Sequence, residues 1–348
     1  MITNIPDLNE TARELAHDRW SSCAHPLGGL GKLETVIEDI AALTRSADID
    51  LKPRTAIILC SDNGVVAQGV TQTGSDVTAA VAKSLANGVT SVCRMASVAN
   101  CKVLPVDMGI KDFTDTQGVL NRRIGNGTRD ITLGAAMTRA DAEKAIQTGI
   151  DLVREEKEKG TRLIATGEMG IGNTTTASAV TSVLLNLPPE QVTGRGAGLS
   201  NDGLKRKIEV VRRAIKINKP NSDDPVDVLA KVGGFDIAGL CGVFLGGAIH
   251  RVPIIIDGAI TAAAALCAYK LAPKSANAMI ASHVSAEPAG RLLLDAIGKE
   301  PIITAGMRLG EGTGAVALIP LLDMALAVYS ESYTFSEGNI KAYKPLGE

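Results

Sequence analysis

Thr55-Ala-Ile-Ile-Leu-Cys60 passes directly into Ser61-Asp62-Asn63-Gly64, and this junction sets the pattern from which we predict the fold. Small and β-branched apolar residues end at a polar turn with glycine, as in a buried strand that delivers polar groups to one edge of a sheet. Residues 102–106, 163–166, 252–256 and 278–281 repeat the pattern, and each run is followed by Asp, Glu, Ser or His at a turn. We therefore predict a strand at each of these places.

Stretches with helical periodicity lie between the predicted strands. One begins at Thr138-Arg-Ala-Asp141, a near match to a capping box, and stops at Gly160. Another, residues 204–215, has apolar residues on one face and lysines and arginines around the rest. Strand, turn and helix repeated in this way predict an α/β fold with a mostly parallel sheet flanked by helices on both faces. In such sheets the ligand site lies beyond the carboxyl ends of the strands.

The composition excludes several classes of partner and cofactor. Lys and Arg total 36 against 38 Asp and Glu, and a formal net charge of -2 gives no global field that would recruit nucleic acid. Only 3% of the residues are aromatic, which does not favour stacking platforms for bases. The four histidines lack metal-ligand spacing, so we expect no metal. No dinucleotide fingerprint loop is found, so we expect no cofactor.

The cysteines and the apolar segments indicate where the protein works. Six cysteines are scattered without a Cys-x-x-Cys pair, mostly in apolar runs, which is typical of reduced core residues in a cytoplasmic protein. Residues 1–7 lack the basic and apolar segments of a signal peptide. Residues 236–250 are too short to span a membrane, and residues 252–272 carry Asp257. We therefore expect these segments to form a buried strand followed by a buried helix, and we expect no membrane partner for the protein.

Three glycine-rich loops carry the residues that could do chemistry. Gly167-Glu-Met-Gly-Ile-Gly-Asn-Thr-Thr175 follows a predicted strand and opens a helix, so it is either an anion-binding loop or an ordinary turn with a polar N-cap. Gly194-Arg-Gly-Ala-Gly198 precedes the basic helix with Lys207, which suits a phosphate, although such lysines alone usually form a solvated face. The third loop is Met307-Arg-Leu-Gly-Glu311-Gly-Thr-Gly314. Its glycines either expose Glu311 to a ligand, as a general base requires, or merely place Glu311 at a helix N-terminus.

Taken in order, these motifs resemble the nicotinate-nucleotide:dimethylbenzimidazole phosphoribosyltransferase family, which builds the lower-ligand nucleotide of cobamides. The resemblance covers nearly the whole chain, beginning at His25-Pro-Leu-Gly-Gly-Leu-Gly-Lys-Leu-Glu34, and its most specific parts are the loops around Glu168 and Glu311. It implies a Rossmann-like catalytic domain, about residues 51–310, and a small helical domain made from residues 1–50 with about 310–348. Because the family's members pair, it also implies a homodimer or a heterodimer with a related subunit.

The resemblance further implies an activity and the residues that carry it. Members move ribose 5-phosphate from nicotinate mononucleotide to an aromatic base with inversion, which gives an α-riboside 5′-phosphate and nicotinate. Glu311 matches the base that takes the proton of the acceptor, and Glu168 matches the second carboxylate. The other residues that we expect at the substrates are Thr73, Val81, Met169, Gly170, Gly172, Asn173, Thr174, Gly194, Gly196, Lys207, Asp257, Ser282, Gly310 and Gly312.

The chain departs from the benzimidazole-using members at the acceptor side. Val77-Thr-Ala-Ala-Val81 has no Gln where those members carry one, Asp62-Asn63-Gly64 replaces Asp-His-Gly, and Met169 stands where Leu is frequent. Loss of a hydrogen-bonding Gln weakens the prediction of dimethylbenzimidazole as acceptor. It favours a branch of the family that attaches phenol or p-cresol through oxygen and works as a heterodimer, in which this chain would be the subunit that retains the base.

Two other classes of function stay open from the sequence. The chain could be a non-catalytic or regulatory subunit of a heterodimeric phosphoribosyltransferase, although the presence of both Glu311 and Glu168 argues against this interpretation. A dinucleotide-dependent oxidoreductase has only the α/β pattern in its favour.

Overall fold

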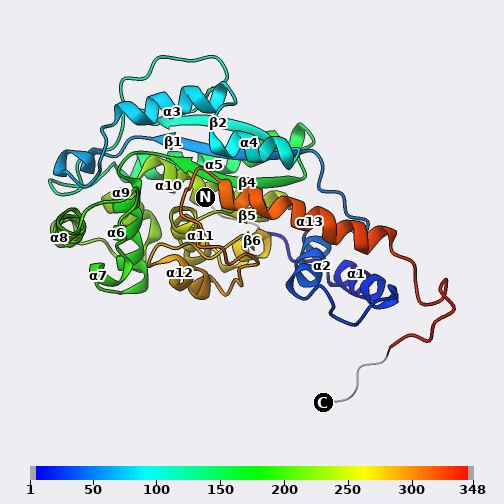
Figure 1. Cartoon of the computed structure of the whole chain (residues 1–348). Coiled ribbons are helices and arrows are strands. Elements are labelled where there is room, and N and C mark those ends of the chain that lie inside the picture. Colours follow the sequence, from blue (N-terminus) through cyan, green and yellow to red (C-terminus); the bar gives the residue numbers. More distant parts are fainter. Residues whose placement is uncertain (1–4, 344–348) are drawn as a thin grey trace.

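The centre of the molecule is a six-stranded parallel sheet in the order β3-β2-β1-β4-β5-β6 (Figure 1). The computed structural model describes residues 5–343. The strands are β1 (Arg54–Ser61), β2 (Lys102–Gly109), β3 (Leu120–Asn121), β4 (Leu163–Met169), β5 (Ile254–Ile256) and β6 (Met279–Ala281). Five of them were predicted, and each begins or ends within three residues of the prediction. The sequence analysis missed β3, because two residues leave no detectable periodicity.

Both faces of the sheet are buried, which explains why its strands are apolar runs and not alternating ones. Every residue of β1 and of β4 is buried. Two large apolar clusters lie on opposite faces, and between them they cover the sheet with helices as predicted (Figure 1). The carboxyl ends of all the strands therefore meet at one open edge, because every neighbouring pair runs parallel.

One face carries most of the helices. They are α5 (Arg139–Glu158), α6 (Asn173–Leu185), α7 (Pro189–Val192), α8 (Asn201–Asn218), α9 (Pro225–Val232), α10 (Phe235–His250), α11 (Ala259–Leu271), the 3-10 turn η2 (Pro273–Ala278) and α12 (Gly290–Ile297). The predicted capping box of α5 is confirmed: Thr138 and Asp141 satisfy each other's backbone N–H groups. Helices α5 and α10 pack backbone to backbone, because a Cβ on Gly149 or Gly242 would collide with the facing helix.

The other face carries α3 (Asp76–Ala86), α4 (Ser91–Val98) and α13 (Thr313–Glu331), with η1 (Gly64–Gln68) following β1. Helices α1 (Glu10–Ser22) and α2 (Lys32–Thr44) pack against each other to one side, and α2 contacts α13 (Figure 1). Helix α13 is held to the start of β1 by the Arg54 guanidinium, which is buried and binds the carboxylate of Asp323.

The two ends of the chain meet beside α1, as the predicted helical domain requires. Cys23 and Thr334 form an antiparallel bridge, and the N–H of Phe335 donates to the carbonyl of Ser22 at 3.0 Å. The ring of Phe335 is buried and stacks edge-to-face on Tyr343. By composition residues 335–348 are a polar tail, and the described part of it, residues 335–343, starts with this anchored aromatic residue, whereas residues 344–348 lie outside the described part. Because α1, α2 and α13 share one apolar cluster with the sheet, the division into two domains stays a prediction.

The apolar segments noted in the sequence are buried helices of this core. Residues 236–250 belong to α10, and residues 252–272 form β5 and α11, as predicted. By length and composition alone, α13 is the one helix of residues 5–343 that could cross a membrane. Half of its most apolar window is buried inside the molecule, which is typical of a core helix and makes it weak support for a span.

Candidate active site

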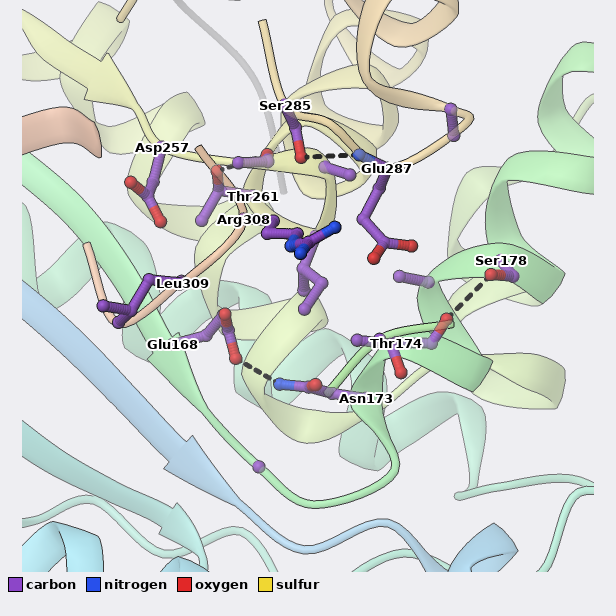
Figure 2. Close-up of a pocket in the computed structure, with 18 of the residues that line it drawn as sticks. Glu168, Asn173, Thr174, Ser178, Asp257, Thr261, Ser285, Glu287, Arg308 and Leu309 are labelled. Atoms are coloured by element: carbon purple, nitrogen blue, oxygen red, sulfur yellow. Dashed lines mark hydrogen bonds between the residues drawn. The ribbon is translucent and has the colours of Figure 1, made fainter. Parts of the chain in front are cut away.

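A cavity of about 210 Å³ opens at the carboxyl ends of β4, β5 and β6. The strand order reverses between β1 and β4, and Glu168 ends β4 beside this switch point, where open α/β sheets bind their ligands. Glu168 and Met169 end β4, Asp257 follows β5, and His283 follows β6, and all four side chains line the cavity. Figure 2 shows Glu168 and Asp257 entering it from adjacent strands.

Glu168 is held by Asn173, the first residue of α6 (Figure 2). The Nδ2 atom of Asn173 donates to Oε2 of Glu168 and also, at 3.1 Å, to Oδ2 of Asp236 on α10. Burial, followed by the negative charge of Asp236, raises the pKa of Glu168 well above its usual range. Burial likewise raises the pKa of Asp236 to about 6. Glu168 in the cavity wall and Asp236 buried beneath it are therefore two carboxyl groups that resist simultaneous ionisation.

Glu311 sits on a turn of three successive left-handed residues: Gly310, Glu311 and Gly312 have φ of 83°, 59° and 84°. Glycine adopts this conformation without strain, whereas Glu311 has to be held in it. A close approach from β4 holds the turn, since a Cβ on Gly167 would lie 2.7 Å from the Gly312 nitrogen. Within residues 5–343 the Glu311 carboxylate makes no hydrogen bond, so it is free to meet a ligand. Burial and the nearby charge of Asp257 raise its pKa.

Asp257 fixes the start of α13 to the end of β5. Its two carboxylate oxygens accept from the N–H groups of Gly312, at 3.1 Å, and Ala315, at 2.9 Å. His283 lies against this carboxylate and hydrogen-bonds Ser282 through Nδ1 at 2.9 Å. Burial lowers the pKa of His283, while Asp257 acts in the opposite direction. Asp257 therefore holds the turn that carries Glu311, and His283 lies beside it in the cavity wall.

A candidate anion cradle lies at the N-terminus of α6, where the helix carries partial positive charge. The N–H groups of Asn173 and Thr175 are paired there with the carbonyls of Gly170, at 3.0 Å, and Gly172, at 2.9 Å. The ammonium of Lys207, on the buried side of α8, donates to Oγ1 of Thr174 at 2.8 Å. Gly196 covers the pair so closely that a Cβ there would lie 2.9 Å from Oγ1 of Thr174. Burial lowers the pKa of Lys207 to about 8, so an anion in the cradle would restore its ordinary protonation.

Several predicted site residues line this cavity, and others stand behind it. In the wall are Glu168, Met169, Gly170, Asn173, Thr174, Gly196, Asp257, Gly310 and Glu311. Four others lie behind the wall. Gly172 caps α6, and the N–H of Gly312 ties the Glu311 turn to Asp257. Ser282 hydrogen-bonds His283, and Lys207 supports Thr174. Gly194 is pressed against the carboxylate of Glu287, which does line the cavity. Thr73 and Val81 lie outside the wall, on an exposed loop and on α3.

The sequence analysis did not assign four groups that the structure brings into or under the site: Arg308, Glu287, His283 and Asp236. Among the described lining residues, Arg308 is the only lysine or arginine, and it points to the centre of the cavity in Figure 2. One feature of the sequence could have identified Asp236: it is the single acidic residue in the otherwise apolar run Gly234-Phe-Asp-Ile-Ala-Gly239. No cluster of three or more potential metal ligands occurs in residues 5–343.

An open parallel sheet with paired carboxylates and a lysine-backed helix N-terminus at its carboxyl edge defines an α/β enzyme that acts on a phosphorylated small molecule. A family model described as "Phosphoribosyltransferase" matches residues 5–340. The chain therefore belongs to this phosphoribosyltransferase family, as the sequence analysis predicted.

Named relatives and solved structures agree with that assignment. The chain is 46% identical over 345 residues, 99% of this chain and 98% of that protein, to the nicotinate-nucleotide--dimethylbenzimidazole phosphoribosyltransferase of Ruminiclostridium cellulolyticum. It is 43% identical to the protein of the same name from Clostridium acetobutylicum, again over 99% of this chain and 98% of the relative. The crystal structure of CobT from Thermus thermophilus superposes with a TM-score of 0.90 at 36% identity, over 96% of this chain and 100% of that one.

Proposed function

We propose that the chain moves ribose 5-phosphate from nicotinate mononucleotide to dimethylbenzimidazole, giving an α-riboside 5′-phosphate and nicotinate for cobamide biosynthesis. The transferase class is that of the family and of the named relatives. The observation that carries the residue assignment is the position of Glu311, whose carboxylate lines the same cavity as Thr174 of the Lys207-backed cradle and makes no hydrogen bond within residues 5–343. The reactants are small molecules, and we place the enzyme in the cytoplasm, where its six free cysteines stay reduced.

In this proposal each group has a task in the transfer. The 5′-phosphate binds beside Thr174 at the N-terminus of α6, and the charge of Lys207, which lies behind Thr174, helps to neutralise it. Glu168 lies beside the sugar and stabilises the positive charge that develops on the anomeric carbon as the bond to nicotinate breaks. Nicotinate leaves readily because its ring nitrogen is cationic before the bond breaks. Glu311 accepts the proton of the attacking acceptor, and its raised pKa suits a base that works near neutral pH.

The proposal also specifies which aromatic compound accepts the ribose 5-phosphate. The names of relatives up to 46% identical support dimethylbenzimidazole. The sequence-based case for phenol or p-cresol depended on Val81 standing in the acceptor site, and this side chain packs into the apolar cluster outside the described cavity wall. We therefore favour dimethylbenzimidazole and keep the phenolic acceptor as the second candidate. A homodimer or a heterodimer with a related subunit completes the proposal.

One product assay tests both the transfer reaction and the identity of the acceptor. The purified chain is given nicotinate mononucleotide with equal amounts of dimethylbenzimidazole, phenol and adenine, and riboside phosphates are identified by mass spectrometry. Dimethylbenzimidazole riboside phosphate supports the proposal, whereas an exclusively phenolic product replaces its acceptor. A mixture containing the Glu311→Gln variant serves as control. No riboside phosphate from the chain, alone or with a related subunit, would overturn the function.

A further inference from the structure

Glu168 and Asp236 are joined through a single amide nitrogen. The Nδ2 atom of Asn173 donates one hydrogen to each carboxylate, at 3.1 Å in the case of Asp236. Asp236 comes from the first turn of α10, and its other oxygen accepts the N–H of Ile237 at 3.0 Å. Gly170 and Gly234 pack against Asp236 so closely that a Cβ on either would lie within 3.0 Å of its oxygens. The bridge therefore has a fixed geometry on both sides of Asn173.

Among residues 5–343 no cation forms an ion pair with Glu168 or Asp236, and both side chains are buried. Arg308 and His283 line the same cavity as Glu168 without forming an ion pair with it. The carboxyl groups that face them are Asp62 at the end of β1, Asp257 after β5 and Glu311 before α13, and each of these opposes a second negative charge on the pair. The thiol of Cys60 also lies near the pair, but burial raises its pKa and keeps it uncharged. Two buried carboxylates without a counter-ion keep one proton between them.

We infer that Asp236 is a positioning residue for the transfer: through Asn173 it orients Glu168, and it forms with Glu168 a carboxyl pair that keeps one proton until a cationic substrate binds. Nicotinate mononucleotide brings the missing cation, because its ring nitrogen carries a positive charge where it joins the ribose. The inference rests on the proposed function, since it concerns the same transfer. The one proton that moves leaves the pair for solvent when the pyridinium ring enters, and no covalent step is added.

This arrangement has a use in catalysis. In the empty enzyme the shared proton limits the cost of burying two acids. When the ring cation binds, the second carboxyl ionises, and Glu168 faces the ribose as a full negative charge. The electrostatic stabilisation is then largest where positive charge develops on the anomeric carbon. A substrate without the ring cation would leave the pair protonated.

The first test is the Asp236→Asn variant, which keeps the size of the side chain and one acceptor oxygen but removes the charge. We expect the acid limb of kcat/KM for nicotinate mononucleotide to move to lower pH, because Glu168 then ionises without opposition from Asp236. The matched control is Glu156→Gln, which removes a buried carboxylate at the opposite end of β1, where it accepts from Thr55 at 3.0 Å. The control leaves the acid limb in place. A purely structural role for Asp236 would lower activity equally at every pH, and an unmoved limb overturns the inference.

A second measurement uses the unmodified enzyme, in case the variant does not fold. Calorimetric titration near pH 6 in two buffers of different ionisation enthalpy counts the protons released on binding. Nicotinate mononucleotide should release more protons than ribose 5-phosphate, because both carry the phosphate but only the first carries the ring cation. Equal release would contradict the shared proton. An enzyme that turns over none of the acceptors would instead overturn the proposed function, so the two failures are distinguishable.

Discussion

The backbone N–H of Gly312 donates to Oδ2 of Asp257 at 3.1 Å, so the turn that presents Glu311 is fixed to the carboxyl end of β5. Asp257 also accepts the N–H of Ala315, and it therefore acts as the N-terminal cap of α13 from a distant part of the chain. The position of the proposed base is set in this way by a carboxylate that lies 54 residues earlier in the sequence (311 − 257).

Replacing Asp257 with Ala should cost both stability and activity. Two N–H groups lose their acceptor, which costs about 1–2 kcal/mol of unfolding free energy. The Glu311 turn also loosens, and we expect kcat to fall by roughly 10²-fold. The matched control is Asp224→Ala, which removes the N-cap of α9, where Asp224 accepts from Val226 and Asp227. Urea unfolding should show similar losses for the two variants, and equal kcat values would contradict the prediction.

Because β4 approaches the Glu311 turn closely, we expect a single methyl group added at Gly167 to lower kcat. A Cβ on Gly167 would lie 2.7 Å from the Gly312 nitrogen and 2.8 Å from the Glu311 carbonyl carbon. In Gly167→Ala the turn has to move, so kcat should fall by roughly tenfold or more. Gly134→Ala is the control, because nothing lies within 4 Å of a Cβ at that position. Steady-state kinetics of both variants decide the point; unchanged kcat in Gly167→Ala would show that the turn is not constrained by β4.

The pH dependence of Glu311 follows from its raised pKa, which is caused first by burial and then by the charge of Asp257. A base has to be ionised, so kcat should rise as pH increases through this raised pKa. Glu311→Gln should lower kcat by roughly 10²–10⁴-fold and abolish that rise. A carboxyl whose pKa is raised by folding stabilises the fold only at acid pH, and the ionised form costs stability above it. Thermal unfolding at pH 7 should therefore show Glu311→Gln to be at least as stable as the parent. A lower melting temperature would mean that Glu311 has a structural role.

Lys207 should lower the stability of the fold and at the same time strengthen the binding of nicotinate mononucleotide. Burial lowers its pKa from 10.5 to about 8, so the protonated ammonium costs stability below about pH 8, and this cost disappears as pH rises toward 10.5. Lys207→Met should raise the unfolding free energy at pH 7 by about 2 kcal/mol. It should also raise the KM for nicotinate mononucleotide by roughly 10–100-fold through loss of a charge-assisted hydrogen bond. The exposed Lys205→Met on the same helix is the control and should change neither quantity. A destabilised Lys207→Met with unchanged KM would contradict the phosphate cradle.

Much of this protein was predictable from local sequence. The short apolar runs 55–60, 163–166 and 252–256 predicted the buried parallel strands β1, β4 and β5, because strands covered on both faces lack alternation. Thr138 and Asp141 identify the start of α5 through a capping box whose bonds are local. The Glu168 and Glu311 loops could be recognised because glycines on both sides of a carboxylate are a compact signal, and both carboxylates line the cavity.

Tertiary structure alone decided which groups meet across the sheet. Asp236 lies 68 residues from Glu168 (236 − 168), inside an apolar helix, and only the packing of α10 against the strands brings it to Asn173. The packing of α3 and α8 likewise leaves Val81 partly buried against an apolar cluster and Lys207 beneath Thr174. Periodicity and capping report contacts within about one turn of chain, whereas these pairings depend on strand order and on helices that close around a common core. The sequence therefore determined the elements and their loops, and the fold determined which charges face one another.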